Sequence, residues 1–422
     1  MSITSTGPAN LTAAVPTDQL PAPIEMLREV ARRYGTPTYA YDLSRVREQI
    51  VRLKTALPPT VEVLYSLKAN ASLGLCSFIA AEGLGADVAS AGELVTALEA
   101  GFPPERILVS GPDKSPGVLE LLPSVRQAIL SLDSVSELEL LAARGQGQRA
   151  LVRLRPDFCS FAQCAAGPGS RFGVPFEDIA RCRDLLASGG VRVVGFHVFS
   201  GSQVLDAAGV IHHLRGGLEL SLRAAEVLRI SPEIIDLGGG FGISYGPEDR
   251  ELDLGAVGEA MASLTTRAAP ARIVVELGRY IVAPGGWYLA TVIAGQTHGG
   301  RPAVVVDGGS HQRGDMCGLK LRHKAFAPVV LDAKTAARVP TDVLGCLSLP
   351  ADVMAEARPL PPLAPGDVLA FPNAGAYGLG GSPFAFHAHP APAEVAFEGT
   401  RIDVLRARRP VQSVLDGQSR LR

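Results

Sequence analysis

Eight short apolar runs, each followed by a stretch with helical spacing of its apolar residues, constrain the fold of this chain most strongly. The runs are rich in β-branched residues and span residues 61–282. They are residues 61–68, 86–90, 106–111, 127–132, 150–156, 193–201, 234–240 and 273–282. Continuous apolar strands alternating with helices are typical of a parallel sheet covered by helices. Eight repeats predict a (β/α)8 TIM barrel, with an open doubly wound sheet as the alternative.

Outside the barrel the pattern changes. Residues 24–35 have helical periodicity, and the stretch TPTYAYDL after them predicts a short strand. After about residue 290 helical periodicity fades, Pro and Gly become frequent, and short β-rich runs predict a mostly-β domain. The predicted organisation is a loose arm (1–24), a segment joining the β domain (25–45), the barrel (46–290), the β domain (291–410) and a loose tail (411–422).

Composition excludes several classes of protein. Forty basic and 42 acidic residues give a net charge of −2, which argues against a nucleic-acid binder. No apolar run approaches the ~18 residues of a membrane span, and the start lacks the pattern of a secretory signal. The six cysteines are scattered without a CxxC pair, so we expect no disulfide framework, no metal site and a cytoplasmic location.

Polar residues stand where the predicted strands end, which is where barrel enzymes place their active sites. Lys68 ends the first strand, in YSLKAN. A lysine that emerges from a core can have a lowered pKa and form a Schiff base with an aldehyde. The alternative is an ordinary surface lysine at a strand end.

The seventh and eighth strands carry features of a phosphate site. Gly238, Gly239 and Gly240 end the seventh strand, where glycines let backbone N–H groups approach an anion closely. Arg279, expected on the eighth strand, adds a positive charge. The alternative is a plain glycine turn, although the loops after strands 7 and 8 are a recurring phosphate site of such barrels.

Further candidates lie at the same predicted end of the barrel. Glu276 stands in an apolar strand, where a carboxylate needs a partner, either Arg279 or the protonated ring nitrogen of a cofactor. His197 is either a satisfied core histidine or a ring that stacks on a flat cofactor, and Ser200 can bind phosphate. The other polar residues near strand ends are Asp87, Glu93, Lys114 and Arg153. Together, a Schiff-base lysine, a phosphate cradle and a ring-nitrogen carboxylate fit pyridoxal 5′-phosphate.

At this point the chain resembles the alanine-racemase-fold pyridoxal-phosphate decarboxylases, the group that includes diaminopimelate, ornithine and arginine decarboxylases. The resemblance covers residues 25–400 and rests on motifs that follow the family's order. They are YSLKAN, GADVASAGE, RLRP, SRFG, FHVFSGSQ, DLGGGFG, ELGR and GAYG. It implies a barrel plus a β domain, and a head-to-tail homodimer with active sites at the interface.

The resemblance also implies roles for individual residues. Lys68 would form the Schiff base, His197 would stack on the ring, and Glu276 would hold the ring nitrogen and stabilise a quinonoid intermediate after loss of the α-carboxylate. The residues implied in phosphate binding are Ser200, Gly238, Gly239, Gly240, Arg279 and Tyr377. Asp87, Glu93 and Arg153 would support the cofactor. Asp352 and Tyr377 would bind an amino-acid substrate.

Two departures from the family pattern concern the substrate and the proton donor. In GCLSLPAD (345–352), Ser348 stands where the family has a cysteine from the partner subunit, and Cys346 lies two residues earlier. The donor is therefore open among Ser348, Cys346, another residue and water. Leu349 replaces the acidic residue that helps to bind a distal amine. We infer a substrate whose far end is not a simple ammonium, and some branches of the family that this sequence resembles act on aminoacyl groups held by carrier proteins.

Other activities were weighed against decarboxylation. Racemases of the same fold typically face the ring nitrogen with arginine, so Glu276 favours a decarboxylase. A cofactor-binding protein without turnover would be a single short barrel, which the β domain and GAYG oppose. A regulator that resembles a decarboxylase would be expected to lose Lys68, Glu276 and Arg279, and all three are present.

Overall fold

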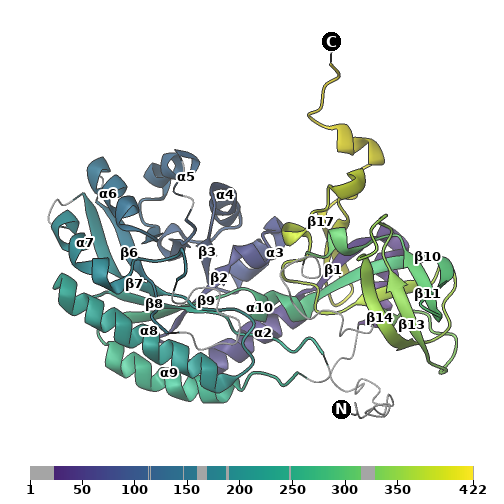
Figure 1. Ribbon diagram of the computed structural model, residues 1–422, viewed down its shortest axis with the longest axis horizontal. Coiled ribbons are helices and arrows are strands. Elements are labelled where there is room, and N and C mark those ends of the chain that lie inside the picture. Colours follow the sequence, from purple (N-terminus) through teal and green to yellow (C-terminus); the bar gives the residue numbers. More distant parts are fainter. Residues whose placement is uncertain are drawn as a thin grey trace, which may run out of the picture.

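The computed structural model describes residues 23–421, except 113, 115, 146, 159–168, 187–189, 247–248 and 315–327. Its larger part is a closed barrel of eight parallel strands that follow one another in chain order (Figure 1). The strands are β2 (Glu62–Ser66), β3 (Gly85–Val88), β4 (Ile107–Val109), β5 (Ile129–Leu132), β6 (Gln148–Leu154), β7 (Val191–Val198), β8 (Ile234–Gly239) and β9 (Arg272–Leu277). The predicted TIM barrel is confirmed, and the open sheet is wrong because β2 pairs with β9 and closes the ring.

Helices cover the outside of the barrel (Figure 1). They are α2 (Leu43–Ala56), α3 (Leu73–Ala81), α4 (Ala91–Glu99), α5 (Pro116–Leu121), α6 (Val135–Arg144), α7 (Ile179–Leu186), α8 (Ala207–Leu228) and α9 (Leu254–Ala268). α6 is capped at both ends: the Ser134 hydroxyl accepts from the Glu137 N–H, and Gly145 ends the helix in a left-handed conformation. No described helix is long and apolar enough to cross a bilayer.

The barrel interior is closed at the end where the strands begin. One apolar side chain each from β2 and from β4 to β9 forms a small buried cluster of Leu64, Leu108, Ile129, Leu151, Val194, Ile234 and Val274. A much larger cluster fills the space between the strands and the helices. Because apolar side chains occupy this end, polar groups inside the barrel gather at the opposite, carboxyl-terminal end of the strands.

Two expected strands end earlier than their apolar runs suggested. β9 stops at Leu277, and residues 279–282 form the short helix α10 (Arg279–Val282), so the expectation that Arg279 lies on a strand is wrong. The break occurs at Gly278, where a Cβ would lie 2.7 Å from the Ala69 Cβ. β2 stops at Ser66, and Lys68 lies in the 3-10 turn Leu67–Ala69 directly after it.

The second part is a nine-stranded sheet. Its strands are β1 (Thr38–Asp42), β10 (Gly286–His298), β11 (Arg301–Val306), β12 (Val329–Val330), β13 (Val339–Leu344), β14 (Val353–Leu360), β15 (Val368–Phe371), β16 (Ala393–Glu398) and β17 (Arg401–Arg406). β1 lies in this sheet, antiparallel to β10 and parallel to β16, and α1 (Ile24–Tyr34) packs beside it. The chain therefore starts in the β domain, forms the barrel and returns. The domain boundaries stay predictions.

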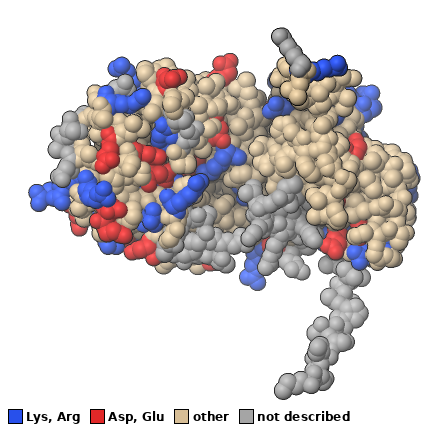
Figure 2. All heavy atoms as spheres, turned by 45° about the horizontal axis from the view of Figure 1, so that its top comes forward, with Lys and Arg blue, Asp and Glu red and all other residues tan. Residues whose placement is uncertain are grey.

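Charge is distributed unevenly between the two parts. In Figure 2 basic and acidic side chains are interspersed over the barrel, whereas the β-domain side of this face shows few charged side chains. The exposed large apolar residues include Ile293, Val339, Leu349, Phe384, Phe386 and Val404, all of the β domain. Exposed large apolar residues also occur on the barrel helices, at Val51, Leu73, Val95 and Leu140, so both parts of the molecule carry them.

Candidate active site

Lys68 projects at the mouth of the barrel beside an acidic residue of the next strand. Its Nζ lies 3.3 Å from Asp87 Oδ2, and its side chain is 41% exposed, whereas that of Asp87 is 1% exposed. Asp87 Oδ1 accepts a hydrogen bond from the Ser110 hydroxyl. The Nζ also lies 5.6 Å from the centre of the Phe199 ring. An amine that is accessible at the end of an otherwise buried pocket is placed to react with a bound aldehyde.

The electrostatics of Lys68 differ from the expectation of a lowered pKa. Desolvation opposes its charge, but the carboxylates of Asp87 and Glu276 more than offset desolvation and raise the pKa of Lys68 above its ordinary value. A protonated amine does not attack a carbonyl, so Lys68 must lose a proton before it reacts with an aldehyde. The Asp87 carboxylate orients the charged Nζ and favours its protonated form.

Three buried side chains from neighbouring strands meet deeper in the mouth. His197 on β7, Asp236 on β8 and Glu276 on β9 bring their side-chain donor atoms within 4.8 Å of one another. His197 Nδ1 is hydrogen-bonded to the Ser131 hydroxyl at 2.7 Å, and its Nε2 lies 3.6 Å from Glu276 Oε1. Neither His197 Nε2 nor Glu276 Oε1 has a hydrogen-bond partner among the described residues.

Burial shifts the protonation of this cluster. Desolvation, followed by the nearby Asp87 charge, raises the pKa of Glu276 to about 7, and desolvation beside Glu276 raises the pKa of Asp236 well above its ordinary value. Desolvation, with the positive charges of Arg153 and Lys68, lowers the pKa of His197 and keeps its imidazole neutral. The cluster is therefore a buried acidic site that lacks a cationic partner at Glu276 Oε1.

This cluster fits the ring of pyridoxal phosphate. A protonated ring nitrogen is a cationic N–H donor, and Glu276 Oε1 is a buried carboxylate oxygen without a donor. The buried His197 ring at the same place is uncharged and flat, so it can lie against the face of an aromatic cofactor. Glu276 does not form the ion pair with Arg279 that was the alternative. Arg279 Nη1 instead donates to the Tyr245 hydroxyl at 2.7 Å.

A second group fits an anion. Gly238 and Gly240 have φ of +63° and +91°, and a Cβ on Gly240 would lie 2.2 Å from the Gly201 carbonyl oxygen, so only glycine is tolerated there. Arg279 is buried, and its Nε has no hydrogen-bond partner among the described residues. Gly239 pairs with Glu276 between β8 and β9, so the glycines lie beside the strand that leads into Arg279. An unpartnered buried guanidinium nitrogen near a glycine turn suits a phosphate.

Ser200 is held by a histidine that the sequence did not single out. His213 Nε2 lies 2.8 Å from the Leu237 carbonyl oxygen, which can only accept, so Nε2 carries the proton. Desolvation lowers the pKa of His213 to about 4, which leaves Nδ1 as an acceptor for the Ser200 hydroxyl at 2.7 Å. His213 thus orients Ser200 from the side of α8.

Glu93 and Arg153 both have structural partners. The Glu93 carboxylate accepts from the Ala89 N–H at 2.7 Å, and the Glu93 N–H donates to the Ser90 hydroxyl, which together cap α4. Arg153 Nη1 lies 3.0 Å from Asp133 Oδ1 and its guanidinium lies 5.9 Å from the Phe199 ring. Their roles toward the cofactor stay predictions.

Tyr377 reaches the barrel mouth from the β domain. Its backbone N–H donates to the Ala69 carbonyl oxygen at 2.6 Å, next to Lys68. Its ring lies 4.7 Å from the Arg279 guanidinium, and its backbone adopts a left-handed φ of +55°. The structure therefore brings Tyr377 together with Lys68 and Arg279, as the sequence motifs suggested.

The remaining candidates lie apart, in the turn between β13 and β14. Ser348 is exposed, with its hydroxyl 3.4 Å from His387 Nε2, and Cys346 Sγ lies 3.8 Å from His389 Nε2. Asp352 is buried and accepts from the Ser310 and Leu347 N–H groups, so in this chain it supports the turn. Among the described contacts none joins this turn to Lys68 or Glu276. The catalytic and substrate roles of these residues stay predictions.

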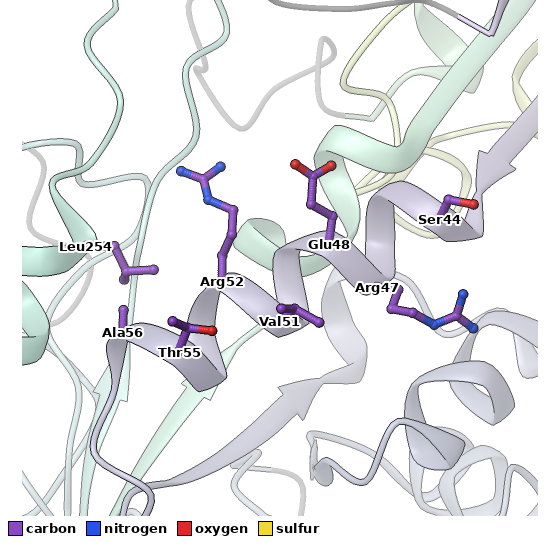
Figure 3. Close-up of a pocket in the computed structure, with 8 residues that line it drawn as sticks. All are labelled: Ser44, Arg47, Glu48, Val51, Arg52, Thr55, Ala56 and Leu254. Carbon is purple, nitrogen blue, oxygen red and sulfur yellow. The ribbon is translucent and has the colours of Figure 1, made fainter.

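A groove elsewhere on the molecule is separate from this chemistry. It is formed by the outer face of α2 and the start of α9, with a lining that includes Val51, Arg52 and Leu254 (Figure 3). None of the candidate residues lines it. We therefore locate the site from the converging side chains at the barrel mouth.

Several residues of the mouth were not found from the sequence. They are Phe199, Ser110, Ser131, His213, Asp236 and Tyr245. Asp236 and Phe199 lie within the motifs DLGGGFG and FHVFSGSQ, so their position in those motifs was an available signal. The two serines and His213 are common residue types without a motif, and only the closure of the barrel brings them to the site.

Comparison with known proteins agrees with this site. Residues 43–283 match the family model described as the pyridoxal binding domain of pyridoxal-dependent decarboxylases. This match covers more than half of the chain and includes β2 to β9 with Lys68, His197, Glu276 and Arg279.

Relatives match over nearly their whole length. The chain is 30% identical over 406 residues to the L-glutamyl-[BtrI acyl-carrier protein] decarboxylase of Niallia circulans, covering 92% of this chain and 95% of the relative. It is 32% identical over 412 residues to the diaminopimelate decarboxylase of Methanothermobacter thermautotrophicus, covering 93% of each. The structure of diaminopimelate decarboxylase from Helicobacter pylori complexed with L-lysine has a TM-score of 0.84 at 26% identity, covering 92% of this chain and 98% of that one.

Proposed function

This chain belongs to the pyridoxal-dependent decarboxylase family, and we propose that it removes the α-carboxyl group, as carbon dioxide, from an amino acid carried on an acyl-carrier protein. Its family makes it a pyridoxal-phosphate-dependent amino-acid decarboxylase. The carrier-bound substrate is the step that we add. The decarboxylase activity rests on the family match, and the carrier-bound substrate rests on Leu349 and on one relative.

The residues of the mouth divide the work of holding the cofactor. Pyridoxal phosphate supplies an aldehyde and an aromatic ring that accepts the electron pair left when the carboxylate departs. Lys68 would bind the aldehyde carbon, and Asp87 would orient its Nζ. Glu276 would face the ring nitrogen and keep it protonated, which favours loss of the carboxylate over racemisation. Arg279, Ser200 and the glycine turn would bind the phosphate.

Leu349 is the observation that carries the choice of substrate. It stands where diaminopimelate and ornithine decarboxylases have an acidic residue for a distal amine, and its side chain is 45% exposed. A leucine offers no hydrogen bond and no charge to an ammonium group. An amino acid whose side-chain carboxyl is joined to a carrier as a thioester has no ammonium group at that end, so it needs no acidic partner there. The relative from Niallia circulans, whose name states a carrier-bound glutamyl substrate, supports the same choice.

The turn that carries Leu349 supports a second proposal, that two copies of the chain share each active site. Ser348, Leu349 and Pro350 are exposed, and the exposed Phe386 stacks on His387, the neighbour of Ser348. In the homodimer that we propose, this apolar turn would enter the barrel mouth of the partner. Ser348, with His387, would there hold the proton that replaces the lost carboxylate at the α-carbon.

The experiment compares free and carrier-bound amino acids in deuterated water, with the products analysed by mass spectrometry. Decarboxylation removes carbon dioxide and adds one deuterium at the α-carbon. We expect this change with glutamate or aspartate attached through the side-chain carboxyl as a thioester to a phosphopantetheinylated carrier protein, which leaves the α-carboxyl free, and at least tenfold slower turnover of the free amino acids. Faster turnover of a free amino acid would overturn the carrier-bound substrate. Deuterium exchange without loss of mass would indicate a racemase.

A further inference from the structure

A cluster of two histidines and a cysteine in the β domain lies outside the cofactor site. His311, Cys346 and His389 come from three segments: the 3-10 turn after β11, the β13–β14 turn, and the segment before β16. Their ligand atoms all lie within 4.8 Å of one another. The Cys346 Sγ and His389 Nε2 atoms are 3.8 Å apart, and the centres of the His311 and His389 rings are 4.7 Å apart.

His311 is a buried histidine whose ring nitrogens lack partners among the described residues, which points to a bound species. Its side chain has no exposed surface, and neither Nδ1 nor Nε2 has a hydrogen-bond partner among the described residues. A buried imidazole normally satisfies at least its N–H, because burying an unpaired polar group costs about 1–3 kcal/mol. A bound species at this place would supply the partner that no described residue provides.

We propose that His311, Cys346 and His389 bind a Zn²⁺ ion. Two imidazole nitrogens and one thiolate are a donor set that zinc prefers, in tetrahedral geometry. Bond lengths of about 2.3 Å to sulfur and about 2.1 Å to nitrogen place such ligands about 3.6 Å apart. The 3.8 Å between Sγ and Nε2 is close to that value. Three protein ligands leave a fourth position for water or another donor.

The backbone around the cluster is already arranged for such an ion. The Asp352 carboxylate accepts from the Ser310 N–H at 2.7 Å and from the Leu347 N–H at 2.9 Å, and these residues adjoin His311 and Cys346. The Cys346 N–H also donates to the Gly308 carbonyl oxygen at 2.9 Å. Asp352 therefore holds two ligand-bearing segments side by side without using the ligands themselves.

An ion here would fix the turn that carries Ser348. Ser348 is two residues from Cys346, and its partner His387 is two residues from His389. A bridge between Cys346 and His389 would hold both residues of that pair in one arrangement. A thiolate bound to zinc has no proton to give, so the site would also assign the proton at the α-carbon to Ser348 and His387 rather than to Cys346.

The test uses the full-length enzyme loaded with its cofactor and freed of any polyhistidine tag. The protein is stripped with a chelator, reconstituted with Zn²⁺ and analysed for bound metal, and its affinity is measured against a competing chromophoric chelator. We expect one ion per chain, and at least tenfold weaker binding in C346S and in H389A. H298A, a histidine of the same domain paired with Asp342, is the matched control and keeps the wild-type affinity.

A second measurement does not depend on variants. Co²⁺ replaces Zn²⁺ in most such sites, and a cobalt–thiolate bond gives an intense charge-transfer band in the near ultraviolet. We expect this band in the wild-type protein. Less than a tenth of an ion per chain after reconstitution, or an affinity of C346S equal to that of wild type, would overturn the site. A cofactor absorbance band that is unchanged in C346S and H389A shows that the variants are folded and separates this result from the decarboxylase activity.

Discussion

Glu276 Oε1 lies 3.6 Å from His197 Nε2 at the mouth of the barrel, and neither atom has a hydrogen-bond partner among the described residues. The pair is not a charged salt bridge, because desolvation lowers the pKa of His197 and keeps the ring neutral. The same desolvation raises the pKa of Glu276 to about 7. A cationic ring nitrogen bound beside Glu276 would favour its carboxylate form and lower its pKa, and the same positive charge would further oppose protonation of His197.

The first prediction concerns the stability of the cofactor-free protein. The pKa of Glu276 rises from its ordinary value of 4.5 to about 7 on folding, so between these values the folded state binds more protons than the unfolded state. The free energy of unfolding therefore falls as the pH rises through this window. Glu276→Gln lacks the titration, so at pH 8 we expect it to be more stable than wild type by up to about 3 kcal/mol.

Urea unfolding of the cofactor-free proteins from pH 4.5 to 8 measures this difference. Near pH 4.5 the advantage of Glu276→Gln over wild type should be smallest. Glu139→Gln, at an exposed glutamate on α6, controls for the loss of a carboxylate. Parallel pH profiles for wild type and Glu276→Gln would show that this carboxylate titrates normally.

A second prediction concerns the covalent attachment of the cofactor. Lys68→Ala removes the amine beside Asp87, so we expect borohydride treatment to fix no cofactor to the chain and turnover to fall by at least about 10³-fold. Intact-protein mass spectrometry with and without borohydride reports the attachment. Lys114→Ala is the matched control, since Lys114 also lies near the mouth, 3.8 Å from Glu137. Cofactor mass retained by Lys68→Ala would mean that another lysine carries it.

A third prediction concerns the proton donor. Ser348→Cys introduces a thiol, which is a far stronger acid than a hydroxyl, at the exposed turn beside His387. We expect the ratio of amine product to carbonyl by-product to rise at least threefold, with the KM for the substrate changed less than twofold. Chromatographic quantification of both products measures this ratio. Ser348→Ala should lower it, and equal ratios in all three proteins would exclude position 348 as the donor.

A fourth prediction concerns substrate choice. Leu349→Glu restores a negative charge at the position where related enzymes bind a distal amine. We expect kcat/KM for free amino acids with a terminal ammonium to increase at least tenfold, and kcat/KM for carrier-bound substrates to fall. Leu349→Gln, of similar size without the charge, is the control. An equal effect of both substitutions would show that side-chain size, and not charge, matters at this position.

The barrel was predictable because its signal is local and repeated. Each apolar run specifies one buried strand, and the helix caps, such as Ser134 and Gly145, are read from single residues. The end of β9 was not predictable from apolarity, because Tyr280, Ile281 and Val282 suit a buried strand as well as a buried helix. The strand ends at Gly278, because only a residue without a Cβ can pass so close to Ala69.

The site was predictable only where residues fall in motifs. Lys68, Glu276 and Arg279 lie in short patterns with recognisable neighbours, and the structure brings them to one end of the barrel. The His311, Cys346 and His389 cluster has no sequence spacing of a metal site, because its members lie 35 and 43 residues apart and meet only through the sheet. The absence of a CxxC pair therefore predicted no metal site where we now propose one.

The hydrogen bond from the Tyr377 N–H to the Ala69 carbonyl oxygen has a consequence for how the enzyme comes into being. The backbone next to Lys68 is finished by a loop made more than 300 residues later in the chain. During synthesis, the strands of the barrel therefore leave the ribosome before the Tyr377 loop that completes the site beside Lys68. A chain truncated after α10 would lack Tyr377, so we expect it to bind the cofactor less tightly than the full-length protein.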